Sequence, residues 1–380
     1  MEEYIIISGL DLQDPNRGTA ALGYGSFSFL KEKGVLTDKT KILSFHYYWN
    51  FLKKKNWGEK RTVRNIQGIN VESVEVKVPN YEKVLFLKFN KMLLFGKLRH
   101  YMSQVKYVAA INGGDGFSDI YTTSTFMYRL TDTFYAMKAK VPVILLPQTI
   151  GPFYDNHNRT IAEGILKYAA EVYVRDDRYV SELDNLGVKY ELTKDLSYYM
   201  RPEDPGIDIL PHAIGLNISG LAYSNAFRGL SGQFDNYKYM IEVLIQRFQT
   251  MNFPVYIIPH SYDYNKPELN NDDMEASREV YSKLKDKENV FLIDRDLISP
   301  QVKYCISKMS YFIGTRMHAN FAAIYTGVPL YGLAYSYKFE GAFKANGAYD
   351  NNISEINNIT KEEANAIIEK IVEDYNRKHK

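Results

Sequence analysis

The sequence predicts an α/β protein with two doubly wound parallel sheets, and three observations support this. Short runs rich in β-branched residues alternate with longer stretches of helical spacing. This alternation occurs twice along the 380 residues, a length that suits two domains. The segment 201–212 separates the two halves, and its three prolines cannot continue a helix or a central strand.

The individual elements follow from the period of the apolar residues. In the first half we expect strands at 4–8, 41–45, 71–78, 105–111, 143–147 and 172–175, and helices at 18–33, 125–139, 159–169 and 178–186. The second half restarts with strands at 214–218, 255–259, 290–293, 311–313 and 330–333, and helices at 236–251, 274–285, 301–309 and 317–325. A last helix at 361–378 follows an Asn-rich stretch and could pack back on the first domain.

These elements predict an organisation into two Rossmann-like domains. We place the amino-terminal domain at 1–200, a linker at 201–213, the carboxy-terminal domain at 214–345 and a tail with a helix at 346–380. Two such domains facing each other would form a cleft outside the carboxyl ends of both sheets, where open α/β sheets bind ligands. The chemistry is therefore expected in the loops that lead from strands into helices.

The composition excludes several classes of protein. Lys and Arg number 47 against 45 Asp and Glu, so a net charge of +2 provides no general attraction for nucleic acid. Cys305 is the single cysteine, which excludes an intrachain disulfide and favours a reducing compartment. The acidic amino terminus and its short apolar run do not resemble an export signal, so we expect a cytoplasmic protein. The histidines lack metal-ligand spacing, and no metal site is predicted.

The strongest candidate for chemistry is the segment around Arg316 and His318. Both residues follow the predicted strand 311–313 directly and open the next helix. An anion at a helix amino terminus meets free N–H groups and a partial positive charge, and here it would also meet a guanidinium and an imidazole. Lys338 lies in the next strand-to-helix loop and could face the same ligand. The alternatives are an ion pair between Arg316 and a local carboxylate, and a solvated Lys338; the convergence of three such side chains favours an anion site.

A glycine-rich segment follows the predicted strand 105–111. Gly113 and Gly114 would let the backbone approach a ligand closely, and Asp115 and Asp119 supply carboxylates. The spacing matches neither a dinucleotide fingerprint nor a P-loop. A tight turn with capping aspartates explains this segment equally well.

Three more residues are weaker candidates. Arg175 ends the strand 172–175 and would point into the cleft beside the glycine-rich segment, or it could pair with Asp176 or Asp177. Asn16 opens the first helix and could contact an anion or a sugar phosphate, although a helix cap is the simpler interpretation. His260 ends a strand of the second half and could meet a sugar hydroxyl or a nucleotide, or serve only as a hydrogen-bonded loop histidine.

Residues 83–106 combine basic and apolar side chains and contain no acidic residue. The pattern resembles an amphipathic helix that lies on an anionic membrane surface. The alternative is a helix packed on the first sheet with its basic face in water. The basic residues of this stretch are Lys83, Lys88, Lys91, Lys97, Arg99 and Lys106.

Taken together and in order, these segments resemble the polysaccharide pyruvyl transferase family. The specific part is GTRMHA at 314–319 followed by GVP at 327–329 and YSYK at 335–338. The remaining likeness lies in NRGTAA at 16–21, GGDGFSD at 113–119, QTIGP at 148–152 and VRD at 174–176.

The resemblance implies a fold similar to the two-domain GT-B glycosyltransferases. It also implies transfer of pyruvate from phosphoenolpyruvate onto a sugar diol as a ketal, in the biosynthesis of a cell-surface, capsular or other exopolysaccharide. Arg316 and Lys338 would bind the phosphate and carboxylate, Arg175 would reach in from the first domain, and His318 would protonate the enol methylene. Phosphoenolpyruvate would be the donor substrate, with no cofactor and no metal. The acceptor-side residues would be Asp115, Asp119, Gly113, Gly114, Asn16 and His260.

Several alternatives remain open from the sequence. The acceptor could be a nucleotide sugar, a lipid-linked sugar or a finished polymer, and the stretch 83–106 tilts the choice toward a lipid-linked acceptor at the inner membrane face. A nucleotide-sugar glycosyltransferase of the GT-B type is the main rival among enzymes, and it would need an acidic residue to grip a ribose. A noncatalytic glycan-binding protein on the same fold is the rival outside enzymes.

Overall fold

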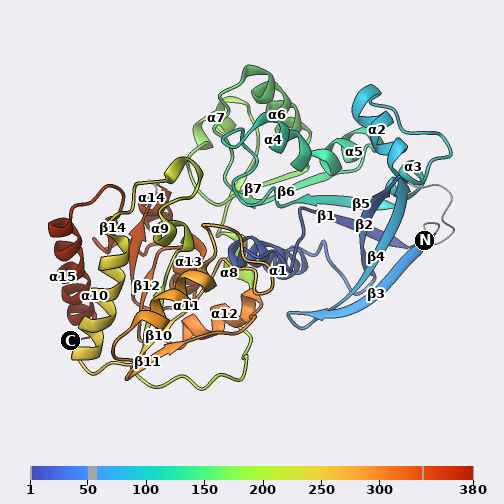
Figure 1. The fold of residues 1–380 in the computed structure, drawn as a ribbon. Helices are drawn as coiled ribbons and strands as arrows, with labels where there is room; N and C mark the ends of the chain where they lie inside the picture. The colour runs from blue at the N-terminus through green and yellow to red at the C-terminus, as the bar shows by residue number, and fades with distance from the viewer. Residues whose placement is uncertain (1, 50–57, 336–337, 380) are drawn as a thin grey trace. The chain divides into compact units, whose positions relative to one another are not determined.

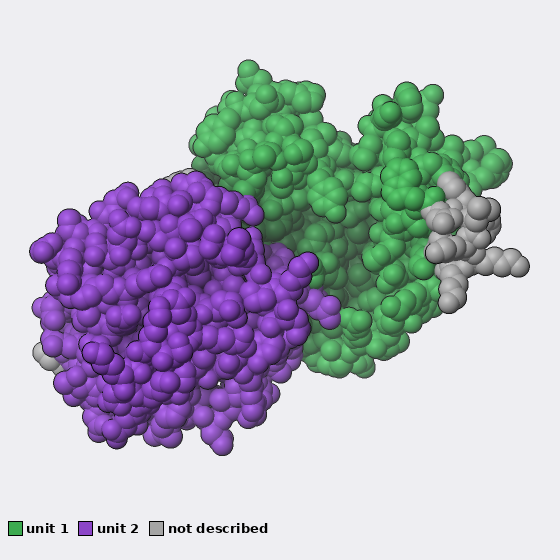
Figure 2. Space-filling view, in the orientation of Figure 1, with its two compact units in different colours: residues 1–11, 22–200 green, residues 12–21, 201–380 purple. Residues whose placement is uncertain are grey.

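A computed structural model describes residues 2–49, 58–335 and 338–379, except for the side chain of Lys338 (Figure 1). The chain forms two compact units (Figure 2). The first unit contains Met1–Asp11 and Leu22–Met200, and the second contains Leu12–Ala21 and Arg201–Lys380. The prediction placed all of 1–200 in one domain, whereas residues 12–21 pack with the second unit.

The first unit is built on one sheet of eight described strands, in the order β3-β4-β2-β1-β5-β6-β7-β8. Neighbouring strands are parallel, apart from the antiparallel pair β3 and β4. The strands are β1 (Glu3–Ser8), β2 (Thr40–Tyr48), β3 (Glu59–Ile66), β4 (Ile69–Pro79), β5 (Val105–Ala110), β6 (Val143–Gln148), β7 (Glu171–Val174) and β8 (Glu191–Leu192). The helices are α1 (Arg17–Glu32), α2 (Asn80–Phe89), α3 (Lys97–Met102), α4 (Thr123–Arg129), α5 (Thr131–Ala139), α6 (Asn156–Tyr168), α7 (Val180–Asn185) and α8 (Leu196–Tyr199).

The second unit contains a sheet of six described strands, all parallel, in the order β11-β10-β9-β12-β13-β14. The strands are β9 (Ile214–Asn217), β10 (Val255–Ile257), β11 (Val290–Leu292), β12 (Tyr311–Gly314), β13 (Leu330–Ala334) and β14 (Ile353–Glu355). The helices are α9 (Gly220–Ser224), the 3-10 turn η2 (Arg228–Leu230), α10 (Tyr237–Thr250), α11 (Asp273–Lys283), α12 (Ser299–Ser307), α13 (Met317–Tyr325), α14 (Lys338–Ala345) and α15 (Lys361–Lys378).

The core of the second unit shows the doubly wound arrangement directly. Alternate residues of a strand point to opposite faces, so Tyr311 and Ile313 of β12 join one apolar cluster and Phe312 joins the other. Helices α9, α10, α11 and α15 contribute to the first cluster, and α12, α13 and α14 to the second. Both faces of the sheet are therefore covered by helices, as all-parallel sheets require.

Three expectations about helices and strands need correction. The stretch expected as one helix at 125–139 is divided into α4 and α5 at the buried Leu130. The strand β3 was not predicted, because its polar sequence EKRTVRNI pairs with β4 only through the backbone at the sheet edge. The stretch 83–106 is not one amphipathic helix, because Asn90 adopts a left-handed conformation (φ 50°) and ends α2.

The carboxy-terminal helix packs within the second unit, not on the first. Its apolar stripe, which includes Ile367, Ile371 and Tyr375, joins the cluster formed by α10 and the sheet. Tyr375 meets Phe248 edge-on at 5.7 Å between ring centroids. The expectation that residues 346–380 pack on the first domain is therefore wrong: the stripe completes one face of the second sheet. In the described part of the chain, no helix is both long and apolar enough to span a bilayer.

Candidate functional site

Asp273, a residue that sequence analysis missed, organises the carboxyl edge of the second sheet. It is the first residue of α11 and is fully buried. Its carboxylate accepts hydrogen bonds from the backbone N–H of Gly220 (2.8 Å), which follows β9, and of Ser261 (2.9 Å), which follows β10. A third partner, Arg316, follows β12. One buried carboxylate thus ties together three strand-to-helix loops, a role that depends on sheet order and leaves no local signal in the sequence.

Arg316 occupies the N-cap position of α13 as a fixed cation. Its Nη2 lies 2.7 Å from Asp273 Oδ1 and also donates to the carbonyl of Asn271 at 2.9 Å. Burial works against the charged form, but the Asp273 carboxylate outweighs it, so the pKa of Arg316 is raised above its ordinary value. The ion pair with a nearby carboxylate, left open by the sequence, is therefore formed, and it holds the guanidinium at the start of α13.

The strand register places the backbone of this segment. Asn217 lies opposite Gly314 where β9 and β12 end, and its Oδ1 accepts the Arg316 N–H at 2.9 Å. The Arg316 side chain makes no capping hydrogen bond to α13. The first-turn N–H groups of a helix have no intrahelical acceptor, so this end of α13 can receive an anion.

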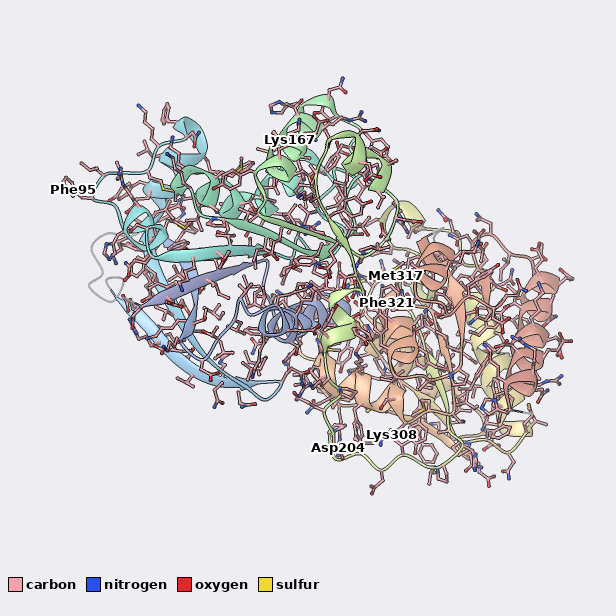
Figure 3. All side chains as sticks on the ribbon, turned by 180° about the vertical axis from the view of Figure 1, so that it is seen from behind. Phe95, Lys167, Asp204, Lys308, Met317 and Phe321 are labelled. Carbon is pink, nitrogen blue, oxygen red and sulfur yellow. The ribbon has the colours of Figure 1, made fainter. Side chains whose placement is uncertain are left out.

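His318 lies in the first turn of α13 and packs against the amino-terminal segment of the chain. Its ring meets Phe321 edge-on at 5.5 Å, and Figure 3 shows Phe321 and Met317 on the same helix. On its other side lies Gly18, where an added Cβ would be only 2.5 Å from His318 Nδ1. The imidazole thus lies between Phe321 and Gly18, and position 18 must be a glycine because a larger side chain would overlap the ring.

The segment 12–21 joins the second unit through its backbone. The Arg17 N–H donates to the carbonyl of His260 at 3.1 Å, and the Tyr262 N–H donates to the carbonyl of Pro15 at 2.9 Å. Asn16 accepts the Gly18 N–H through Oδ1 at 2.9 Å. Asn16 is therefore the helix cap that was the simpler interpretation, and it brings the start of α1 next to His318.

Arg17 locks this segment in place, a role that the sequence did not reveal. Its Nε donates to the carbonyl of Leu297 at 2.6 Å, and its Nη2 pairs with Asp296 at 3.0 Å. The guanidinium also lies over the ring of Tyr262, 4.3 Å from the centroid. These contacts of the buried Arg17 explain why residues 12–21 belong to the second unit although they precede most of the first.

His260 lies beside the same cluster as a buried neutral base. It is 4% exposed, and its backbone N–H donates to Asp273 Oδ2 at 3.2 Å. Burial lowers the pKa of the His260 imidazole well below its ordinary value, and nearby His318 and Arg316 add to this effect. His260 is therefore uncharged at neutral pH.

Lys338 begins α14, in the loop that follows β13. Because β13 is the neighbour of β12 in the sheet, this loop is next to the one that carries Arg316. The Lys338 side chain lies outside the described residues, so its predicted contact with the ligand stays a prediction.

In the first unit, the glycine-rich loop after β5 lies against two arginines. Gly114 has φ +80°, and a Cβ there would be 2.8 Å from Arg175 Nη1. A Cβ at Gly116 would be 1.7 Å from Arg129 Nη1. Gly114 and Gly116 are therefore needed for this loop to approach the guanidinium groups, and the approach to a ligand predicted for Gly113 and Gly114 stays a prediction.

The Arg175 side chain is 11% exposed and is paired, but not with either of the expected partners. Its Nη1 lies 2.6 Å from Asp195 Oδ2, and its Nε donates to Thr149 Oγ1 at 3.0 Å. Burial disfavours the charged form, but Asp195 and Asp115 outweigh it and raise the pKa of the Arg175 guanidinium. Asp195 precedes α8 and was not a candidate, because nothing local in the sequence connects it to the end of β7.

Arg129, at the end of α4, is a further cation that sequence analysis missed. Its guanidinium lies 5.1 Å from the centroid of the Tyr121 ring. Its Nη1 is buried and finds no hydrogen-bond partner in the described part of the chain. A buried guanidinium nitrogen beneath a glycine-rich loop is a candidate contact for a polar ligand.

The two aspartates of the loop have different roles. Asp115 accepts the Tyr121 hydroxyl at 3.0 Å. Asp119 instead accepts the N–H groups of Tyr154 and Asp155, both at 2.9 Å. Burial disfavours the charged carboxylate, but these donors outweigh it and lower the pKa of Asp119. Its carboxylate thus holds the chain that leads into α6, and the acceptor-side role of Asp119 stays a prediction.

The predicted residues thus form two groups. Arg316, His318, His260 and Asn16 come together in the second unit, and Gly113, Gly114, Asp115 and Arg175 come together in the first. Within the described residues, no group of three or more His, Cys, Asp or Glu side chains is arranged to hold a metal ion.

Two doubly wound α/β units with cationic and polar side chains where their strands end define a GT-B-like fold. UDP-GlcNAc 2-epimerase from Neisseria meningitidis, bound to UDP-GlcNAc, is similar with a TM-score of 0.51 at 13% identity, over 98% of this chain and 91% of that chain. UDP-GlcNAc 2-epimerase from Methanocaldococcus jannaschii is similar with a TM-score of 0.50 at 11% identity, over 98% and 93%.

The family is shown by the sequence itself. The family model described as polysaccharide pyruvyl transferase matches residues 16–337. The chain therefore belongs to the polysaccharide pyruvyl transferase family, which confirms the resemblance drawn from its motifs. No curated protein matches the sequence significantly.

Proposed function

We propose that the protein transfers pyruvate from phosphoenolpyruvate onto a sugar diol as a ketal, in the biosynthesis of a cell-surface polysaccharide. The observation that carries this proposal is the position of His318. Its imidazole lies in the first turn of α13, between Gly18 and Phe321, and directly after the ion-paired Arg316. Family membership supports the same reaction class.

The second unit offers the features that a small dense anion needs. Phosphoenolpyruvate carries a phosphate and a carboxylate on a three-carbon enol. The start of α13 supplies N–H groups and a partial positive charge, and Arg316 is held there by Asp273. Lys338 would add a second cation from the adjacent loop.

The chemistry assigned to His318 is general acid catalysis. The imidazolium gives its proton to C3 of the enol, which becomes a methyl group and leaves C2 electrophilic. One sugar hydroxyl then attacks C2 and loses its proton, which restores the imidazolium. The C2–O bond to phosphate breaks with its electron pair on the phosphate, the second hydroxyl closes the ketal at C2, and the proton of that hydroxyl leaves with the phosphate.

The contacts of Asp273 argue against the alternative function, a nucleotide-sugar glycosyltransferase. Such an enzyme needs an acidic side chain that is available to a ribose. Asp273 lies at the carboxyl edge of the second sheet, where a ribose would bind. However, its Oδ1 accepts hydrogen bonds from Gly220 and Arg316, and its Oδ2 accepts one from Ser261. Its oxygens are thus committed to the protein, which favours the smaller anion as ligand.

The test combines binding and turnover. Phosphoenolpyruvate should raise the melting temperature of the native protein, since ligand at 100 Kd adds about 2.7 kcal/mol of stability. His318→Ala should keep this binding but lose phosphate release that depends on a sugar acceptor. Lys338→Ala should weaken binding by about 1.5–3 kcal/mol. The exposed His46 provides the matched control, His46→Ala, which should change neither property.

Two results would refute the proposal. One is a native protein that responds to a nucleotide sugar and not to phosphoenolpyruvate, which would point to glycosyl transfer. The other is a His318→Ala variant with native turnover, which would remove this residue as the acid.

A further inference from the structure

The first unit exposes a group of large apolar side chains between α2 and α3. Phe95 is 96% exposed, Leu94 64% and Phe89 63%. Figure 3 shows Phe95 at the outer end of this unit, projecting away from the ribbon. Single exposed apolar residues are common, but several that adjoin in one loop mark a contact surface. We call it the α2–α3 surface, and its residues are Leu87, Lys88, Phe89, Lys91, Leu93, Leu94, Phe95 and Arg99.

The loop is held in this shape at both ends. Asn90 ends α2 in a left-handed conformation. Glu82 caps α3, since its carboxylate accepts the N–H groups of Lys97 (3.2 Å) and Leu98 (2.9 Å). A Cβ at Gly96 would lie 2.6 Å from Glu82 Oε2, so a glycine is required at the turn. The loop between α2 and α3 is therefore fixed at both ends and holds its apolar side chains in contact with solvent.

The charges of this surface are all of one sign. Lys88, Lys91 and Arg99 are exposed and form no ion pair with any residue that the structure describes. Glu82 is the single acidic residue between 80 and 106, and it is buried with its carboxylate turned to α3. The whole chain carries a net charge of only +2, so this positive character is local.

We propose that the α2–α3 surface docks on an anionic lipid bilayer. Leu94 and Phe95 would enter the interface between headgroups and acyl chains, while Lys88 and Lys91 contact lipid phosphates. A protein partner would need acidic and apolar side chains placed to match this surface. An anionic bilayer offers negative headgroups and an apolar interior at every point, so it fits the loop in any orientation. An apolar groove of about 560 Å³ borders this surface: Leu87 belongs to both, and Phe86 and Phe134 also line the groove, so apolar side chains extend from the surface into the unit.

The first experiment is co-sedimentation of the full chain with vesicles. Binding is expected to vesicles of phosphatidylcholine with phosphatidylglycerol, to weaken with salt, and to be lost on pure phosphatidylcholine. The double variant Leu94→Ser, Phe95→Ser should bind at least about tenfold more weakly, since two apolar anchors are removed. The matched control is Tyr154→Ser, Leu269→Ser, which removes two apolar side chains of comparable exposure elsewhere.

A local probe tests which residues enter the membrane. Phe95→Cys can be labelled with an environment-sensitive fluorophore, because the native Cys305 is buried and burial raises the pKa of its thiol to about 12. A blue shift is expected on addition of anionic vesicles. The same label at Leu269→Cys in the second unit should not respond.

Three outcomes would overturn the proposal. They are absence of binding to anionic vesicles, equal binding of the Leu94 and Phe95 double variant, and a dimer in light scattering that this variant converts to a monomer. The last would make the surface a contact between two copies of the chain. All three are independent of phosphoenolpyruvate binding, which the double variant should retain.

Discussion

Gly18 and His318 are in direct contact within the second unit: a Cβ at Gly18 would lie 2.5 Å from the Nδ1 atom of the imidazole. Gly18 is the second residue of α1, and its φ lies outside the left-handed region. The glycine is therefore required by the space that the ring occupies and not by the backbone conformation. This relationship makes the first turn of α1 part of the His318 site.

Replacing Gly18 with alanine should displace His318 without preventing folding. Alanine suits a helix, so the effect should be local, with a loss of stability of about 1–3 kcal/mol from overpacking. A ring moved by about 1 Å should lower kcat by about 100-fold. Steady-state kinetics and thermal unfolding measure the two effects. The control is Gly164→Ala in α6, where a Cβ meets nothing within 4 Å, so activity should persist and stability should rise slightly. Native turnover in Gly18→Ala would mean that the ring position is not critical.

Breaking the pair between Asp273 and Arg316 should be costly. Asp273→Asn leaves a buried guanidinium without its counter-charge, and we expect a loss of about 3–5 kcal/mol in the free energy of unfolding by urea. The exposed pair of Arg247 and Glu369 serves as the comparison, and Glu369→Gln should cost about 0–1 kcal/mol. Adding Arg316→Met to Asp273→Asn should recover part of the loss. If the double variant were less stable than the single one, an unpaired charge would not be the cause.

His260 should make stability depend on pH in the acidic range. Its folded pKa lies well below 6.5, whereas in the unfolded chain the imidazole takes up a proton near that value. Protonation therefore favours the unfolded state, and stability is lost as the pH falls below 6.5 toward the folded pKa. The stability difference between native protein and His260→Gln should shrink by about 1.4 kcal/mol between pH 7.5 and pH 5.5. A stability difference between native protein and His260→Gln that stays constant from pH 7.5 to pH 5.5 would contradict the assignment.

The two aspartates of the glycine-rich loop should separate in their effects. Asp119→Ala removes the acceptor for the N–H groups of Tyr154 and Asp155, so it should lower stability by about 1–3 kcal/mol and leave the KM for a sugar acceptor unchanged. Asp115→Ala should raise the KM for a sugar acceptor and should lower stability by less than Asp119→Ala does. Thermal unfolding and initial rates distinguish them. A raised KM in a folded Asp119→Ala protein would instead support the acceptor-side role of Asp119.

Much of the fold could be read from short-range patterns. Strands such as β9, β12 and β13 are buried on both faces and therefore appear as continuous apolar runs. The fold class and the family were accordingly predicted and are confirmed. Strand β3 escaped prediction because an exposed edge strand needs no apolar face, and its pairing with β4 is formed by the backbone.

The site could be predicted only in part. The sequence places Arg316 and His318 at the start of a helix because both follow a strand directly. It does not reveal Asp273, which lies 43 residues from Arg316 along the chain, or Asp195 as the partner of Arg175. It left open whether Asp119 meets a ligand or caps a turn, because a carboxylate after a strand looks the same in both cases; the structure shows its bonds to the loop before α6.

By itself, then, the sequence determined the alternation of strands and helices, the two sheets and the loops that carry charged side chains, because these depend on the spacing of neighbouring residues. The tertiary structure alone decided which charges are paired, that α15 covers the second sheet, and that residues 12–21 leave the first unit to meet His260 and His318. The physical reason is that burial and ion pairing depend on which loops the order of strands brings to one edge of a sheet, and this order is a property of the whole fold.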